Sequence, residues 1–74
     1  MALRFIGKDP DSPTGESPTV WEDGDDFVIQ GGKVTSPHEV AELLRAAGQD
    51  AVPGHEVLVR FPKRLAYMFA EDAG

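Results

Sequence analysis

The sequence predicts a small α+β domain with the element order β-β-β-α-β-α. Two local patterns support this fold class: a pair of β-prone runs around an acidic turn, and a later apolar stripe with helical spacing behind a Ser-Pro pair. We expect a sheet of three or four strands, one capped helix and a short C-terminal helix. At 74 residues the chain fits one domain, 1–74, whose core is near the lower limit of size.

The segment PTVWEDGDDFVIQGGKV, residues 18–34, organises the prediction. The β-prone runs TVW and FVI flank an Asp-Gly dipeptide, which is a strong hairpin signal because glycine accepts a positive φ. With that dipeptide as a two-residue loop, Trp21 pairs with Asp26. With a loop that extends to Asp25, Trp21 pairs with Phe27, and we favour this register because it forms an aromatic cross-strand pair.

The flanking segments are assigned from composition. Residues 3–6 predict a short strand, and 8–17, rich in proline and short polar residues, predict a loop or mobile arm that buries almost nothing. Gly31 and Gly32 predict a bulge, a bend or a close backbone approach. They lack the further glycines or Lys-Ser/Thr of a phosphate-binding loop.

A helix is predicted at 37–47. Ser36 stands at N-cap, proline follows at the first helical position, and Glu39 completes a capping box. Apolar residues at 40, 43, 44 and 47 form one stripe, and Gly48 provides the stop.

The late part of the chain predicts another strand and helix. Residues 57–61 read as an interior strand because both faces are largely apolar. Pro62 ends this strand and can open a second helix, in which Leu65, Met68 and Phe69 share a face. Residues 71–74 are expected to fray.

Composition limits the classes of function. The net charge is −6, from 13 acidic and 7 basic residues, so nucleic-acid binding by phosphate neutralisation is not expected. The chain has no cysteine, which fits a reducing compartment. The N-terminal apolar run is too short for a signal-peptide core, and no stretch approaches a membrane span. We therefore expect a cytoplasmic protein.

No residue pattern predicts catalysis, a cofactor or a metal site. His38 and His55 lack the converging ligands that zinc requires. The carboxylates around Asp9 and around the hairpin turn lack the EF-hand spacing. No serine lies in a nucleophile-elbow pattern, so enzymatic function is disfavoured.

Two groups of opposite charge predict a protein-interaction surface. The acidic group lies at the hairpin tip, and the basic group lies where the last strand becomes the last helix. Solvated charge is the favoured interpretation of such charge runs, and electrostatic steering of a protein partner is the functional alternative. An apolar anchor of that surface could come from Trp21, Tyr67, Met68 or Phe69, although core burial is the expected fate of at least two of these four residues. The candidate interaction residues are Trp21, Asp23, Asp25, Asp26, Arg60, Lys63 and Arg64.

Three stretches, RFIGKDPDSPTGESPTVW, FVIQGGKV and EVLVRFPKRL, carry a resemblance that covers nearly the whole chain. Together they resemble a family of short acidic actinobacterial proteins of unassigned function, with a GKDP segment, an SPT-V run, a QG-x-KV strand end and a late P-x-R. Relatives are often encoded near helix-turn-helix regulators, which implies a partner role in regulation. Many of them carry Trp where this chain has Gly32, and no functional residue can be carried over.

The sequence thus predicts a non-enzymatic protein-interaction module with an unidentified protein partner, and the resemblance implies that this partner is a helix-turn-helix regulator to which the protein is accessory. The alternative is a domain that binds a small ligand or a divalent metal at the Gly31-Gly32 bend or the acidic tip. Exposed strand edges and a small core are also compatible with a homodimer.

Overall fold

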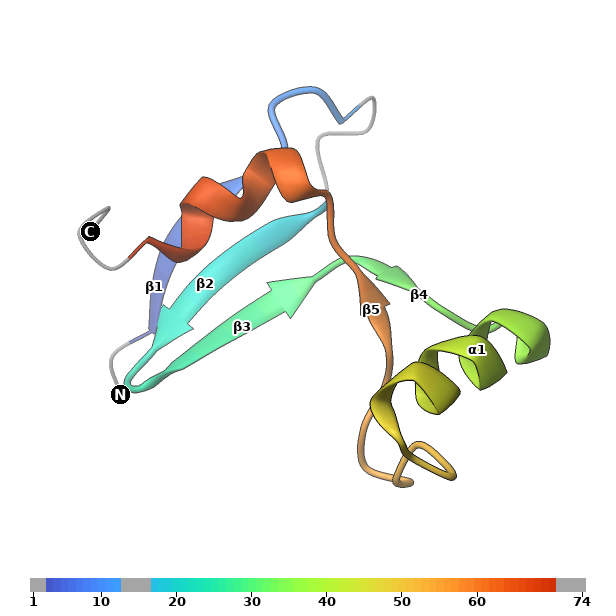
Figure 1. Ribbon diagram of the computed structural model, residues 1–74. Helices are drawn as coiled ribbons and strands as arrows, with labels where there is room; N and C mark the ends of the chain where they lie inside the picture. Colours follow the sequence, from blue (N-terminus) through green and yellow to red (C-terminus); the bar gives the residue numbers. More distant parts are fainter. Residues whose placement is uncertain (1–2, 13–16, 71–74) are drawn as a thin grey trace.

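β2, Thr19–Asp23, is the central strand of a three-stranded antiparallel sheet with the order β1-β2-β3. The computed structural model describes residues 3–12 and 17–70, which fold as α+β (Figure 1). Its other elements are β1 (Leu3–Lys8), β3 (Asp26–Gln30), β4 (Gly32–Lys33), α1 (Pro37–Ala47), β5 (Val59–Arg60) and the 3₁₀ helix η1 (Lys63–Phe69).

The fold class agrees with the sequence prediction, and the expected sheet of three strands is present as β1-β2-β3. The element order has one addition, β4, which pairs with β5 in a separate two-stranded sheet. The predicted frayed end, 71–74, lies outside the described residues.

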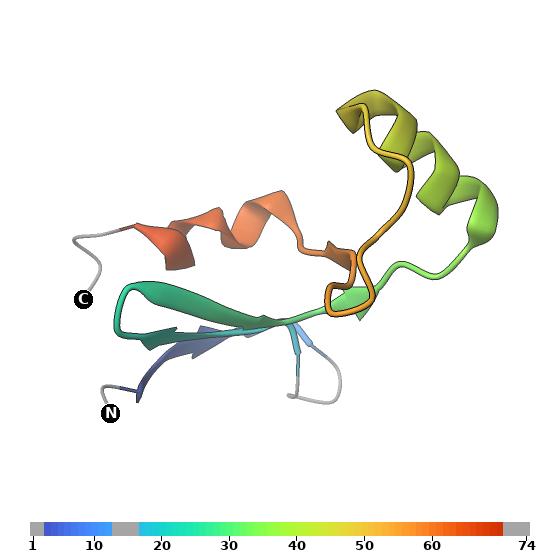
Figure 2. The ribbon, with the colours of Figure 1, turned by 90° about the horizontal axis from the view of Figure 1, so that it is seen from below.

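η1 covers one face of the three-stranded sheet (Figure 2). Leu65 and Met68 of η1 are buried against Val20 of β2, and half-buried Ile6 and Phe69 pack around them. These three buried side chains are the apolar core of the described residues. The prediction that Leu65, Met68 and Phe69 share an inward face is confirmed.

The hairpin exists, but both predicted registers are wrong. The two-residue loop is Gly24 and Asp25, so Trp21 lies opposite Val28 rather than opposite Asp26 or Phe27. Gly24 has φ 61°, and a positive φ at the first loop position is what a type II′ hairpin turn requires.

The covered face explains why this register is preferred. Phe27 lies opposite Glu22 and points to the same side as Val20, since alternate residues of a strand share a face. There its ring meets Phe69 edge-to-face, with centroids 5.1 Å apart. The predicted pairing with Trp21 would have placed Phe27 on the opposite face, away from η1.

The prediction that 8–17 buries almost nothing is wrong for its first residues. Lys8 is the last residue of β1 and pairs with Thr19. Asp9 is only 6% exposed, and its backbone N–H donates to the carbonyl of Pro18. Burial of this carboxylate is compensated by hydrogen bonds, which are described below. Residues 13–16 of the predicted loop lie outside the described residues.

α1 has the predicted bounds, but its N-terminus lacks the predicted capping box. Ser36 makes no side-chain cap hydrogen bond, and the carboxylate of Glu39 accepts from Arg60 instead. The ion pair competes for the Glu39 oxygens that a capping box requires. The predicted stop is confirmed, because Gly48 caps the helix with φ 71°.

β5 is shorter than predicted and is not an interior strand. Of the predicted 57–61 only Val59 and Arg60 form a strand, which pairs antiparallel with β4 alone. The chain leaves the three-stranded sheet at Gly31, so only the two residues of β4 lie beside the late strand. Val57 is 60% exposed as a result.

Gly31 makes the close backbone approach that was one of the predicted options. A Cβ built there would lie 2.9 Å from the carbonyl oxygen of Arg60 and 2.9 Å from Cγ1 of Val59. A Cβ built at the neighbouring Gly32 would meet nothing within 4 Å. The two glycines therefore differ in role, although the sequence presents them as a pair.

We expect Gly31→Ala to reduce the free energy of unfolding by about 1–3 kcal/mol, because the added methyl overpacks against backbone that cannot move freely. Gly32→Ala is the matched control and should be neutral or stabilising, by at most about 1 kcal/mol. Urea unfolding of both variants measures this difference. Equal losses from the two variants would contradict the close approach at Gly31.

Candidate interaction surfaces

An apolar groove lies between α1 and the β4–β5 ribbon. Its volume is about 390 Å³ and it is lined by Val34, Leu43, Leu58, Val59, Arg60 and Phe61, which we call the helix groove. Leu43 belongs to the apolar stripe of α1 and is 44% exposed. No residue of α1 is buried, so the stripe predicted for this helix is only loosely covered.

A second hollow shares Val34 and Leu58 with the helix groove. It measures about 290 Å³ and takes in Val40 of α1 and Val52 and Val57 from the connection to β5. The apolar side chains around α1 thus converge without closing on one another.

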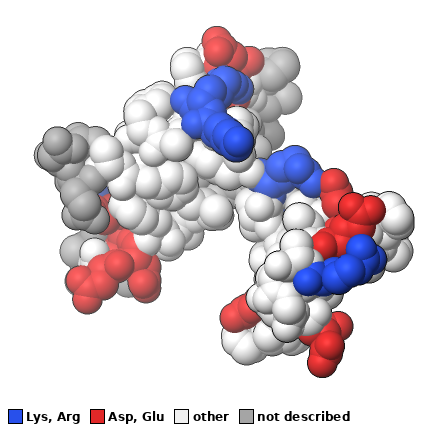
Figure 3. All heavy atoms as spheres, viewed as in Figure 1, with Lys and Arg blue, Asp and Glu red and all other residues white. Residues whose placement is uncertain are grey.

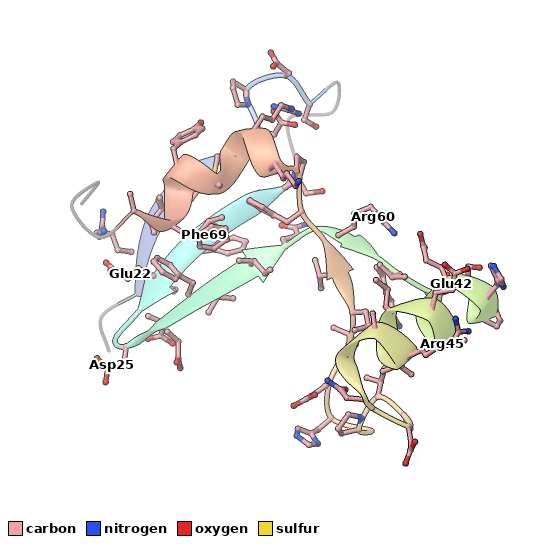
Figure 4. The ribbon with its side chains drawn as sticks, in the orientation of Figure 1. Glu22, Asp25, Glu42, Arg45, Arg60 and Phe69 are labelled. Atoms are coloured by element: carbon pink, nitrogen blue, oxygen red, sulfur yellow. The ribbon has the colours of Figure 1, made fainter. Side chains whose placement is uncertain are left out.

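Arg60 stands at the rim of the helix groove. Its guanidinium donates to the Glu39 carboxylate of α1, and both side chains are about half exposed. Figure 4 shows Arg60 directed toward the start of α1. An exposed pair of this kind contributes little to stability, but it fixes one end of α1 beside β5.

Arg64 forms a two-pronged ion pair with Asp9. Nη1 donates to Oδ1 at 2.9 Å and Nη2 donates to Oδ2 at 2.6 Å, and the backbone N–H of Asp11 donates to Oδ1 at 3.0 Å. The hydrogen bonds from Arg64 and then from Asp11 hold the pKa of Asp9 below its ordinary value of 3.8. The same pair raises the pKa of the Arg64 guanidinium.

The predicted basic group is therefore divided among different partners. Arg60 pairs with α1 and Arg64 pairs with the segment after β1, while Lys63 is exposed at the start of η1. Figure 3 shows the acidic side chains of the hairpin end well apart from the basic side chains near η1. The two groups keep separate positions on the surface, but two of the three cations are already neutralised within the chain.

The acidic tip is divided in a similar way. Glu22 faces the η1 side and accepts from its cross-strand neighbour Arg4 at 3.0 and 2.8 Å. Asp23 and Asp26 lie opposite each other on the other face, and Asp25 occupies the loop (Figure 4).

Trp21 lies at the centre of an apolar row on the face that η1 leaves uncovered. Phe5 and Val28 are its direct cross-strand neighbours, and Leu3 is two residues before Phe5 on the same face. Leu3, Phe5 and Val28 are 57%, 56% and 43% exposed. We call these four residues the open sheet face.

The remaining predicted anchors of η1 have different positions. Met68 is buried in the core and Phe69 is half-buried, whereas Tyr67 is 60% exposed. Trp21 is therefore the predicted anchor that joins an exposed apolar row.

The histidines pair locally with acids. His38 Nε2 lies 2.9 Å from Glu42 one turn along α1, and His55 Nε2 lies 3.6 Å from Glu56. Within 3–12 and 17–70, no group of three or more His, Asp and Glu side chains is arranged to hold a metal ion. Neither helix in that part of the chain has the length and apolar character to span a bilayer.

Neither the helix groove nor the open sheet face was predicted from the sequence. The apolar stripe of α1 was predicted. Val34 and Leu58 form the opposite wall of the helix groove, and no local sequence pattern indicates that these two residues meet there after folding. The strand that contains Leu3 and Phe5 was predicted from the sequence. Their alignment with Trp21 required the true strand register.

Comparison of the chain with protein-family models, with curated proteins and with solved structures gave no match.

The Asp9–Arg64 pair predicts an acid-dependent contribution to stability. The folded-state pKa of Asp9 lies below 3.8, the ordinary value of the unpaired carboxyl. The stability that the ion pair contributes is therefore complete above pH 3.8 and is lost as the pH falls through the folded-state pKa. Asp9→Asn should lower the thermal midpoint at neutral pH, and its difference from the parent chain should narrow on acidification.

Asp11→Asn is the matched control, since its side chain is 80% exposed and its contact with Arg64 is 3.7 Å. This variant should melt close to the parent chain in thermal unfolding followed by circular dichroism. If the thermal midpoints of Asp9→Asn and the parent chain differ as much in strong acid as at neutral pH, the Asp9–Arg64 pair is not the source of the acid dependence.

Proposed function

We propose that the protein is a non-enzymatic, cytoplasmic protein-interaction module, accessory to a helix-turn-helix transcriptional regulator. The observation that carries the proposal is the helix groove, in which the apolar stripe of α1 faces Val34 and Leu58 without burying a single residue of the helix. An amphipathic helix is normally stabilised by burial of its apolar face. A bound partner would supply the missing contacts.

The helix groove suits an apolar segment of a protein. The helix groove and the second hollow share Val34 and Leu58 in their linings, so one bound segment could place an apolar side chain in each. Insertion of regularly spaced apolar anchors into such a groove is a common mode of peptide recognition. The ion pair of Arg60 and Glu39 at the rim offers polar contacts at one end.

Charge favours a basic partner. The chain carries a net charge of −6, and a protein that binds DNA carries lysine and arginine for phosphate contacts. Opposite net charges accelerate encounter and disfavour partners of like charge. The acidic residues of the hairpin tip contribute to this long-range attraction.

The family resemblance points to the same partner class. Its members are often encoded near helix-turn-helix regulators, and many carry Trp at the position of Gly32. A Cβ built at Gly32 meets nothing within 4 Å. This chain lacks that aromatic side chain, so the helix groove is the contact region that we propose for it.

A small apolar ligand is the second candidate for the same groove. Its volume of about 390 Å³ lies within the range of roughly 300–1,000 Å³ that is common for ligand sites. Such a ligand would cover the apolar stripe of α1 without any protein partner.

The test compares two substitutions that each add one negative charge to α1. Leu43→Asp places the charge in the helix groove, whereas Ala41→Asp places it outside the apolar stripe on an exposed position. We expect the parent chain and Ala41→Asp each to capture one helix-turn-helix regulator from a lysate of the native cells. Both should also bind that regulator once it has been purified. Leu43→Asp should weaken that binding about tenfold or more.

Two results would contradict the proposal. Equal binding by both variants would remove the helix groove from the interface. Absence of any regulator, together with localised and saturable NMR shifts of α1 on titration of apolar metabolites, would favour the small-ligand candidate.

A further inference from the structure

The open sheet face is a second apolar surface, separate from the helix groove. Phe5, Trp21 and Val28 form a direct cross-strand row over β1, β2 and β3. The opposite face of these strands is covered by η1 (Figure 2), while no described helix covers the open one. Aromatic residues, tryptophan above all, are enriched at the centres of protein interfaces.

The dimensions of the chain show how much surface it leaves uncovered. Its accessible surface is 5673 Å², about 1,200 Å² more than the roughly 4,450 Å² expected for a folded monomer of 8.0 kDa. Its radius of gyration is 14.2 Å, against about 11 Å for a compact domain of this length. A stable protein interface buries about 800 Å² per partner, so the excess is sufficient for one.

We propose that a second copy of this chain stacks on the open sheet face, giving a two-fold symmetric sandwich with Trp21 of each copy at its centre. Sheets pack face to face about 10 Å apart through apolar side chains of their inner faces. With η1 on each outer face, both three-stranded sheets of the dimer would then be covered on both sides.

The two ends of this face carry opposite charges, so they are complementary to those of a second copy whose ends are reversed. Asp23 and Asp26 lie at the hairpin end, and exposed Lys8 lies at the opposite end, opposite Thr19. A two-fold axis along the strands would bring the acidic pairs of both copies together. An axis across the strands brings Lys8 of each copy to the acidic pair of the other, and this orientation is the one that charge favours.

The dimer is independent of the helix groove. The open sheet face and the helix groove share no residue, so a dimer can form whether or not the groove binds a regulator. Leu43→Asp should therefore leave the self-association unchanged.

The experiment is sedimentation equilibrium of the purified chain from micromolar to near-millimolar concentration. The parent chain should approach twice its mass of 8.0 kDa. Phe5→Glu and Val28→Lys, two changes at exposed positions of this face, should each raise the dimer dissociation constant about tenfold or more. Tyr67→Glu, an aromatic of similar exposure on η1, is the control and should dimerise like the parent.

Charge reversal tests the orientation of the two copies. Lys8→Glu should weaken the dimer, and the double variant Lys8→Glu/Asp26→Lys should recover much of the loss. Circular dichroism verifies that each variant is folded. A parent chain that stays monomeric overturns the proposal. So does a dimer whose dissociation constant is unchanged in both Phe5→Glu and Val28→Lys. The proposal also fails if Tyr67→Glu weakens the dimer as much as these two variants do.

Discussion

The contact of η1 with β2 is the interaction on which the rest of the structure depends. Leu65 and Met68 cover Val20, and these are the buried apolar side chains of the described residues. Phe69 extends the same contact to Phe27, and Arg64 fastens the start of η1 to Asp9, far away in the sequence. Without η1 the sheet would have both faces exposed, and a free sheet of three short strands is marginal in water.

This small core explains why so much apolar surface remains outside. The residues after Gly31 leave the three-stranded sheet, and α1 lies beside the β4–β5 ribbon rather than on that sheet (Figure 1). No residue of α1 is buried, so the helix cannot draw much stability from the chain itself. Small domains often reach adequate stability through association. Among the described residues, the helix groove and the open sheet face are the apolar surfaces that we propose for such association.

Local signals in the sequence were sufficient where the structure is local. α1 begins at Pro37 and stops at Gly48 as predicted, because proline and glycine act on their own backbone. The hairpin register could not be predicted, since glycine is acceptable in more than one loop position and a distant ring, Phe69, decides between them. Of the candidate surface, Trp21 was identified from the sequence. The groove beside α1 was not, because its walls come from segments that meet only after folding.

The central claim is that the isolated chain is incomplete and that association supplies part of its stability. The most direct test is urea unfolding of the parent chain at protein concentrations that span the micromolar range. Binding of the folded chain to a second copy adds stability by mass action. The midpoint should therefore rise with protein concentration. A midpoint that stays constant over that range, with a monomer that is fully folded when dilute, would contradict the account.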